Sequence, residues 1–282
     1  MQNMNYKPLD LPPVSQMLRD AGMEPKKQLG QNFLFDLNLT RKIACSVPDI
    51  ENSVVLEIGP GPGGLTRALL DAGARKVIAV EKDSTALPIL EKIRDAANGR
   101  LEIILGDALR ISNEQLAISN NDHLVICANL PYNVGTELLI GWLHLIANCS
   151  LLIPNSMTLM FQREVAERIV AKVGDKQYGR LAVLTALTAN AKILFNVPNT
   201  AFVPAPKVQS AVVQIIPKRS AIGNYQLAAV EKLTAKLFGQ RRKMIRGILP
   251  DVNWGEFGLS GTERAEELSP ETYQEIASKI MV

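Results

Sequence analysis

Short apolar segments alternate with helix-like stretches through the first half of this chain. The apolar segments are rich in Val and Ile, as is typical of buried strands. They are residues 54–58, 77–81, 101–105 and 124–128. The helix-like stretches are residues 64–73, 84–97 and 134–148. Such alternation predicts an α/β fold, in which a parallel sheet carries helices on both faces.

The alternation continues in the second half and then stops. A fifth strand is expected near residues 155–161, and amphipathic helices over 163–172 and 180–191 follow it. Residues 192–197 and 208–216 predict a closing pair of strands, so we expect a mostly parallel sheet of seven strands.

From about residue 220 the chain has helical segments with no strand between them. They are residues 225–238, 240–249 and 270–281. This change predicts a small all-helical second domain, with its boundary near residues 217–223.

A glycine-rich loop, EIGPGPGG, ends the first strand. Gly59, Gly61 and Gly64 have the GxGxxG spacing of a dinucleotide-binding loop, although a structural turn would use glycines too. Glu81 ends the next strand, where a carboxylate can accept both hydroxyls of a ribose. Together they indicate a nucleoside ligand, but they do not separate NAD from S-adenosylmethionine (SAM).

Three features of the strand ends favour SAM. Glu57 adds a carboxylate that suits a ligand carrying ammonium and sulfonium charges. Pro60 and Pro62 remove N–H groups that a phosphate cradle would use. Asp107, which follows the third strand, can accept the amino group of adenine, although Asp is also a common helix N-cap. An NAD oxidoreductase ranks last, because no catalytic His or Tyr/Lys pair is evident.

The tetrapeptide NLPY follows the fourth strand, at the carboxyl end where a parallel sheet binds ligands. The amide oxygen of Asn129 and the carbonyl of Pro131 can accept hydrogen bonds from an exocyclic amine, and Tyr132 can stack on its ring. The plainer alternative is a strand-to-turn transition with a half-buried tyrosine.

The net charge of +3 is small, so any affinity for nucleic acid must come from local clusters of charge. The densest cluster lies on the predicted helix over 240–249 and favours contact with phosphate. It consists of Arg241, Arg242, Lys243 and Arg246.

The three cysteines have neither zinc-site nor disulfide-framework spacing, so we expect no metal and a reducing compartment. Neither a signal peptide nor a transmembrane segment is apparent, so we expect a cytoplasmic protein without membrane contact.

Several motifs, in this order along the chain, closely resemble those of the small-subunit ribosomal RNA adenine dimethyltransferases. NLPY is shared with other adenine-amine methyltransferases, whereas the last two motifs are specific to the family. The motifs are QNFL at 31–34, EIGPG at 57–61, Glu81, GD at 106–107, NLPY at 129–132, FVPAPKVQS at 202–210 and FGQRRK at 238–243.

The resemblance implies a Rossmann-like SAM-dependent methyltransferase fold with a small helical C-terminal domain. On this basis we expect an N-terminal extension over 1–23, a catalytic domain over 24–219 and a helical RNA-recognition domain over 220–282. Cofactor contacts would fall on Asn32, Leu34, Gly59, Gly61, Glu81, Asp107, Ala108 and Asn129.

The implied reaction adds two methyl groups to each of two adjacent adenosines near the 3′ end of small-subunit rRNA. Tyr132 and Phe202 would sandwich the target base, while Asn129 and Pro131 hold its amine. Lys26 and Lys27 near the cofactor entrance, with the 241–246 cluster, would hold RNA. The expected partner is the small ribosomal subunit or its precursor, bound by a monomer.

Two alternatives to this function remain from the sequence. One is a large-subunit rRNA adenine methyltransferase of the resistance type, which shares NLPY. The other is a ribosome-assembly factor that acts chiefly by binding.

Overall fold

The computed structural model describes residues 7–24, 32–110, 116, 118–119, 122–148, 153–218 and 222–280. Contacts within the chain divide it into two compact units. Unit 1 comprises Met1–Leu138, Pro154–Arg163 and Ile193–Ile215, and unit 2 comprises Leu139–Ile153, Glu164–Lys192 and Ile216–Val282. The boundaries expected from the sequence, 24–219 and 220–282, remain a prediction.

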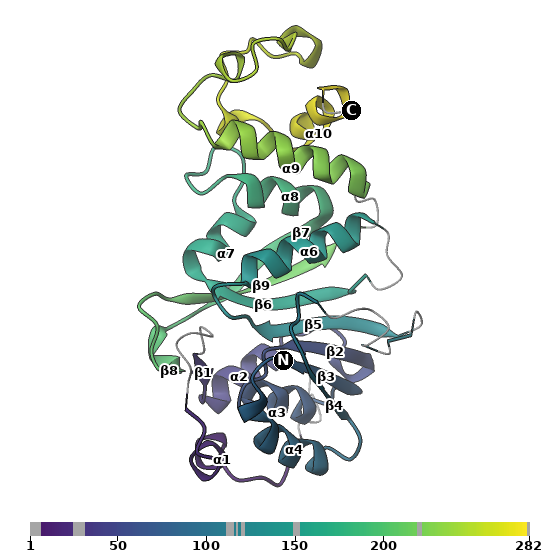
Figure 1. The fold of residues 1–282 in the computed structure, drawn as a ribbon, viewed down its shortest axis with the longest axis vertical. Helices are drawn as coiled ribbons and strands as arrows, with labels where there is room; N and C mark the ends of the chain where they lie inside the picture. Colours follow the sequence, from purple (N-terminus) through teal and green to yellow (C-terminus); the bar gives the residue numbers. More distant parts are fainter. Residues whose placement is uncertain are drawn as a thin grey trace. The chain divides into compact units, whose positions relative to one another are not determined.

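Seven strands form one sheet in the order β4-β3-β2-β5-β6-β9-β7 (Figure 1). The pairs from β4 to β6 are parallel, and β9 runs antiparallel to β6. The expected mostly parallel, seven-stranded α/β fold is confirmed. The strands are β2 (Ser53–Ile58), β3 (Lys76–Glu81), β4 (Leu101–Leu105), β5 (His123–Asn129), β6 (Ser156–Gln162), β7 (Ala189–Val197) and β9 (Ser210–Pro217).

The strand order places a crevice between β2 and β5. From β2 the chain moves outward through β3 to β4, and it then returns to pair β5 with the other side of β2. The loops that leave β2 and β5 therefore diverge at the carboxyl edge of the sheet, which is where open α/β sheets bind ligands. These two loops are the glycine-rich loop and NLPY.

Three helices of unit 1 pack with the strands into one apolar core. They are α2 (Leu37–Ala44), α3 (Gly64–Asp71) and α4 (Leu87–Ala96), which Figure 1 shows beside β2, β3 and β4. Asp36 caps α2, because its side chain accepts the N–H groups of Asn38 at 2.9 Å and Leu39 at 3.2 Å. The core gathers Leu69 of α3, Ile93 of α4 and Val77 of β3, among others.

The N-terminal segment packs on α3. It contains helix α1 (Val14–Asp20), whose Met17 is buried in the core of unit 1. Arg67 of α3 donates to the carbonyls of Pro12 at 2.5 Å and Leu11 at 3.3 Å. Asp71, one turn later, accepts the N–H of Leu9 at 2.8 Å. Residues 7–24 are therefore built into unit 1 through the helix that begins at the glycine-rich loop.

Unit 2 is mainly helical, and α8, α9 and α10 pack against one another. Tyr273 of α10 is fully buried and stacks on Phe238 of α9, with 5.8 Å between the ring centroids. The helices are most of α6 (Gly135–Ala147) and α7 (Arg163–Val170), with α8 (Arg180–Thr188), α9 (Asn224–Phe238) and α10 (Pro270–Ile280).

The predicted helix over residues 240–249 is wrong. α9 ends at Phe238, and only the short 3-10 turn η5 (Ile245–Gly247) follows. The backbone here forms isolated turns and also bonds to a distant loop, because Ile245 N donates to Glu263 O at 2.8 Å and Arg246 N donates to Gly261 O at 3.0 Å. The four basic residues therefore lie on a folded loop.

Smaller differences concern the ends of elements. Residues 189–191 belong to β7 instead of the preceding helix, because Ala189 already has an extended backbone. Two strands of two residues each, β1 (Phe33–Leu34) and β8 (Phe202–Val203), pair with each other and were not predicted. The other 3-10 turns are η2 (Ile50–Asn52), η3 (Ser84–Ala86), η4 (Asn199–Ala201), η6 (Trp254–Phe257) and η7 (Ala265–Glu267).

Candidate active site

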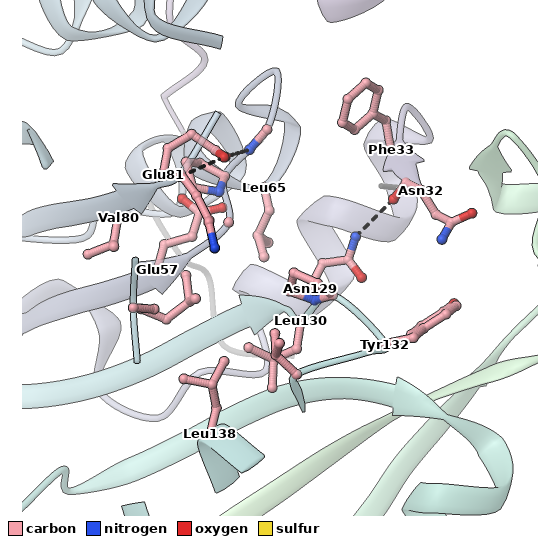
Figure 2. Close-up of a pocket in the computed structure, with 18 of the residues that line it drawn as sticks. Asn32, Phe33, Glu57, Leu65, Val80, Glu81, Asn129, Leu130, Tyr132 and Leu138 are labelled. Atoms are coloured by element: carbon pink, nitrogen blue, oxygen red, sulfur yellow. Dashed lines mark hydrogen bonds between the residues drawn. The ribbon is translucent and has the colours of Figure 1, made fainter. Parts of the chain in front are cut away.

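A pocket opens at the carboxyl edge of the sheet, within unit 1 (Figure 2). Its walls come from the loops after β2, β3, β4 and β5 and from residues 32–34. Figure 2 shows Glu57 and Glu81 gathered at one end, and Asn129 and Tyr132 at the other. The predicted residues that line it are Asn32, Leu34, Gly59, Gly61, Glu81, Asp107, Ala108, Asn129, Pro131 and Tyr132.

The glycine-rich loop needs glycine for its conformation and for close packing. Gly61 has φ +53°, and its N–H donates to Glu81 Oε2 at 2.9 Å. A Cβ on Gly64 would lie 2.6 Å from the carbonyl oxygen of Leu34, so β1 can approach only because Gly64 has no side chain. This approach brings residues 32–34 over the loop.

Glu81 joins the glycine-rich loop to the end of β3. Besides Gly61, its carboxylate accepts the N–H groups of Lys82 at 2.9 Å and Asp83 at 2.8 Å. Burial raises the pKa of Glu81, and these three N–H groups oppose that rise. The carboxylate is thus held in place at the position that the sequence analysis assigned to a ribose.

Glu57 is a buried acid at the pocket wall. Its side chain is 1% exposed, and its Oε2 has no hydrogen-bond partner among the described residues. Burial raises the pKa of Glu57 to about 8; the nearby Thr66 hydroxyl opposes this rise, and the neighbouring Glu81 carboxylate adds a smaller rise. A buried acid that keeps one oxygen without a partner favours a ligand that brings positive charge, as SAM does, over a pyrophosphate.

Asp107 lines the pocket from the loop after β4. Its Oδ2 pairs with Lys82 Nζ at 2.8 Å, and its Oδ1 accepts the N–H of Leu109 at 3.1 Å. The hydrogen bond from Lys82 and that from Leu109 lower the pKa of Asp107. Asp107 is therefore an ionised acceptor that also organises its own turn, whereas its contact with the adenine amino group stays a prediction. Lys82 was missed, because a lone lysine after a strand carries no signal.

The side chain of Asn129 is oriented by the main chain of Asn32, the residue just before β1. Its Nδ2 donates to the carbonyl oxygen of Asn32 at 3.1 Å, a contact drawn in Figure 2. A carbonyl can only accept, so the NH2 group must face Asn32 and the amide oxygen is left for another donor.

The carbonyl of Pro131 starts helix α6. It accepts the N–H groups of Val134 at 3.2 Å and Gly135 at 3.0 Å. A carbonyl oxygen has two lone pairs, so both are already engaged. The Pro131 carbonyl therefore accepts N–H groups of the main chain in this structure, whereas the sequence predicted that it accepts an N–H of the substrate amine.

The two aromatic residues predicted to hold a base have different surroundings. Tyr132 is half-buried at the pocket, and its hydroxyl bonds to Ser210 Oγ at 2.7 Å. Phe202 is only 2% exposed, belongs to the core and is not among the lining residues. Pairing of β8 with β1 turns Phe202 inward and leaves Val203 exposed. The sequence analysis named Ser210 only as part of the motif FVPAPKVQS, because its contact with Tyr132 can be recognised only in the folded structure.

The basic residues of the 241–246 cluster lie in unit 2. Arg242, Lys243 and Arg246 are exposed, whereas Arg241 Nε pairs with Glu266 Oε2 at 3.1 Å. Lys26 and Lys27 lie outside the described residues.

The histidines do not line the pocket. His123 Nδ1 bonds to Ser53 Oγ at 2.9 Å, and His144 contacts Asn224 at 2.8 Å and Glu231 at 3.0 Å. Across the described residues, no group of His, Cys, Asp or Glu is arranged to hold a metal ion. None of the described helices combines the length and apolarity that spanning a membrane requires.

Comparison with known proteins yields one family over nearly the whole chain. The family model described as "Ribosomal RNA adenine dimethylase" matches residues 22–280. A ribosomal RNA small subunit methyltransferase A from Chelativorans sp. (strain BNC1) is 49% identical, over 96% of this chain and 98% of the relative. A protein of the same name from Azorhizobium caulinodans is 50% identical, over 92% and 89%.

Solved structures agree with this assignment. A dimethyladenosine transferase from Plasmodium falciparum superposes with a TM-score of 0.70 at 25% identity, covering 86% of this chain and 95% of that one. The 23S rRNA methyltransferase ErmE superposes with a TM-score of 0.64 at 22% identity, covering 89% and 100%, and shows a shared fold. The chain thus belongs to the ribosomal RNA adenine dimethylase family, and it is an rRNA adenine dimethyltransferase that uses SAM as its methyl donor.

Proposed function

We propose that this enzyme dimethylates the exocyclic N6 of two adjacent adenosines near the 3′ end of small-subunit rRNA, as part of small-subunit biogenesis. Relatives of about half-identical sequence are named for the small subunit, which supports this target. The 23S rRNA enzyme is similar only in fold, so it lends no support to a large-subunit target.

The orientation of Asn129 is the observation on which this proposal depends. Because Asn32 takes the NH2 group, the amide oxygen of Asn129 is the acceptor left for an N–H of the adenine amine. An amine nitrogen conjugated with a ring is a weak nucleophile. Acceptors for its hydrogens favour a pyramidal nitrogen with a free lone pair, which is catalysis by positioning.

The second acceptor is a main-chain carbonyl of NLPY. The Pro131 carbonyl is engaged at the start of α6, so we assign this role to the adjacent Leu130 carbonyl. Pro131 then acts indirectly, since its ring restricts the turn and its carbonyl anchors the helix. Once alkylated, the nitrogen is acidic and its proton can leave to water, so no strong base is required.

The rest of the pocket suits SAM, which supplies an electrophilic methyl group when bound. Glu81 would accept the ribose hydroxyls, and Asp107 with Ala108 would meet adenine. Gly59 and Gly61 allow close approach of the main chain, with Asn32 and Leu34 above them. Glu57 would balance the positive charge of the ligand.

Tyr132 would provide the surface on which the target base stacks, a contact worth about 1–3 kcal/mol. The predicted contact of Phe202 with the base requires a change at β8 and stays a prediction. Arg242, Lys243 and Arg246 are exposed and would contact phosphates, together with Lys26 and Lys27. Action as a monomer stays a prediction.

Methylation of undermethylated small ribosomal subunits would test the proposal, with large subunits in parallel and nucleosides read by mass spectrometry. We expect dimethyladenosine only in the small-subunit reaction. Product only in large-subunit RNA would contradict the target. Subunit binding without methylation on any substrate would indicate a binding factor instead.

A further inference from the structure

The hydroxyl of Ser210 lies against the tip of the Tyr132 ring. Tyr132 Oη and Ser210 Oγ are 2.7 Å apart, and Ser210 is fully buried. Tyr132 lines the pocket from the loop after β5, while Ser210 is the first residue of β9. Both lie in unit 1. Tyr132 belongs to NLPY and Ser210 to FVPAPKVQS, and the contacts proposed for the cofactor and the amine do not explain why these two motifs meet.

The direction of β9 explains why these residues meet. β6 lies between β5 and β9, and Ser210 is in register with Gln162, the last residue of β6. Because β9 is antiparallel, its first residue lies at the same edge of the sheet as the carboxyl ends of β5 and β6. A parallel strand would have placed Ser210 at the far edge, away from the pocket.

The surroundings hold Ser210 firmly. Arg163 N, which follows β6, donates to Gln209 O at 2.9 Å, so the ladder continues beyond Ser210. Burial raises the pKa of Tyr132, and the bond to Ser210 opposes that rise, so the phenol stays neutral. The bond is therefore a neutral, partly buried tether, and it restricts an aromatic side chain that has two rotatable torsions.

We propose that Ser210 is a positioning residue, whose hydroxyl holds the Tyr132 ring in the orientation that stacks on the target adenine and matters most for the second methyl transfer. This rests on the proposed function, in which Tyr132 is the stacking surface. The unmethylated amine offers two N–H groups to acceptors, whereas the monomethyl amine offers one. Stacking on an oriented ring must then contribute more to holding the base.

A double-mutant cycle with Ser210→Ala, Tyr132→Phe and the combined variant tests this proposal. Each single change removes one hydroxyl and keeps the aromatic ring. We expect each to lower kcat/KM for small subunits about fivefold, the loss typical of one neutral hydrogen bond. The double variant should lose about as much as either single one, and SAM affinity should be unchanged.

Product distribution gives a second readout that loss of stability alone would not change. Ser210→Ala should accumulate monomethyladenosine, because the second transfer slows more than the first. Ser156→Ala on β6 is a matched control, since that serine is also buried in the sheet but its hydroxyl has no partner among the described residues. It should leave the ratio of products unaltered.

Several outcomes separate failure of this inference from failure of the proposed function. Independent, multiplying effects of the two single changes, or an unchanged product ratio, would overturn the tether. Full activity of Tyr132→Leu would show that the ring is not the stacking surface and would overturn the tether while the proposed reaction stands, whereas no dimethyladenosine from the wild type on small subunits would overturn the proposed function itself. Loss of activity in Tyr132→Leu with unchanged Ser210→Ala and Tyr132→Phe would overturn the tether alone. If Ser210→Ala does not fold, as judged by its thermal midpoint, Tyr132→Phe carries the same test.

Discussion

The two ends of the pocket are held by hydrogen bonds that span very different separations along the sequence. At the cofactor end, the Glu81 carboxylate accepts the N–H of Gly61, 20 residues away, and those of its next two neighbours. At the base end, Asn129 contacts Asn32, 97 residues away, and Tyr132 contacts Ser210, 78 residues away. The Glu81 contacts at the first end need only one βαβ unit, whereas the contacts at the second end join distant parts of unit 1.

This difference implies that the two functions can be separated by mutation. Changes at the base end should abolish methyl transfer while SAM still binds. Changes at the cofactor end should weaken SAM binding first.

Asn129→Ala should cause the largest loss. It removes the oriented amide oxygen, and loss of one such polar group typically costs about 10²- to 10³-fold in kcat. SAM affinity should fall far less, because the cofactor end keeps its Glu81 contacts. Single-turnover methylation and calorimetric titration with SAM would measure the two effects. A parallel collapse of both would mean that the ends are one unit.

Glu81→Ala should weaken SAM binding by roughly 10- to 100-fold, the range for losing hydrogen bonds to a charged group. It also releases the N–H groups of Gly61, Lys82 and Asp83, so the glycine-rich loop loses its anchor. Glu81→Gln, which keeps an acceptor oxygen, is the matched control and should lose less. Saturating SAM should restore most of kcat, and a kcat that stays low would argue that Glu81 also serves the base end.

Neutralising Arg242, Lys243 and Arg246 together should weaken subunit binding without affecting either end of the pocket. Each lost phosphate contact lowers the salt dependence of log K by about one. Filter binding across a salt series would measure the change. Arg241→Ala is the contrasting variant, because Arg241 is paired with Glu266 and should affect the stability of unit 2 instead. An unchanged salt slope in the triple variant would remove this segment from the RNA interface.

Glu57→Gln should have the smallest effect on methyl transfer at neutral pH and saturating SAM, because glutamine resembles the protonated acid that burial favours, and its main effect should be on stability. The ordinary pKa is 4.5 and the folded value is about 8, so the folded state binds the proton more tightly than the unfolded state. Stability of the ligand-free protein therefore falls as pH rises between these values, by at most about 1.4 kcal/mol per pH unit from this group.

The glutamine variant should lose this part of the slope, which chemical denaturation at several pH values would show. SAM should also release a proton from the wild type when it binds, because a positively charged ligand favours the ionised form. Calorimetry in buffers of different ionisation enthalpy would detect the release. An identical pH slope in both proteins would rule out titration of Glu57 in this range.

Local sequence patterns were sufficient to predict those strands, loops and helices whose conformation depends mainly on their own residues. The strands from 54–58 to 124–128 are short apolar runs rich in Val and Ile, which favour strands, and the structure has β2, β3, β4 and β5 there. The helix over 240–249 was predicted from composition and is wrong, because its backbone bonds to residues 261 and 263. Helical propensity is a weak preference that such tertiary contacts override.

The sequence by itself determined the α/β fold, the glycine-rich loop with Glu81 and the position of NLPY after a buried strand. It also carried the motifs of the family to which the chain belongs. Only the tertiary structure decided which lone pairs are free: Pro131 starts a helix, Asn129 is turned by Asn32, and Phe202 is buried while Tyr132 is tethered by Ser210. The physical reason is that a hydrogen bond joins groups by distance in space, and antiparallel β9 brings together residues that no local pattern relates.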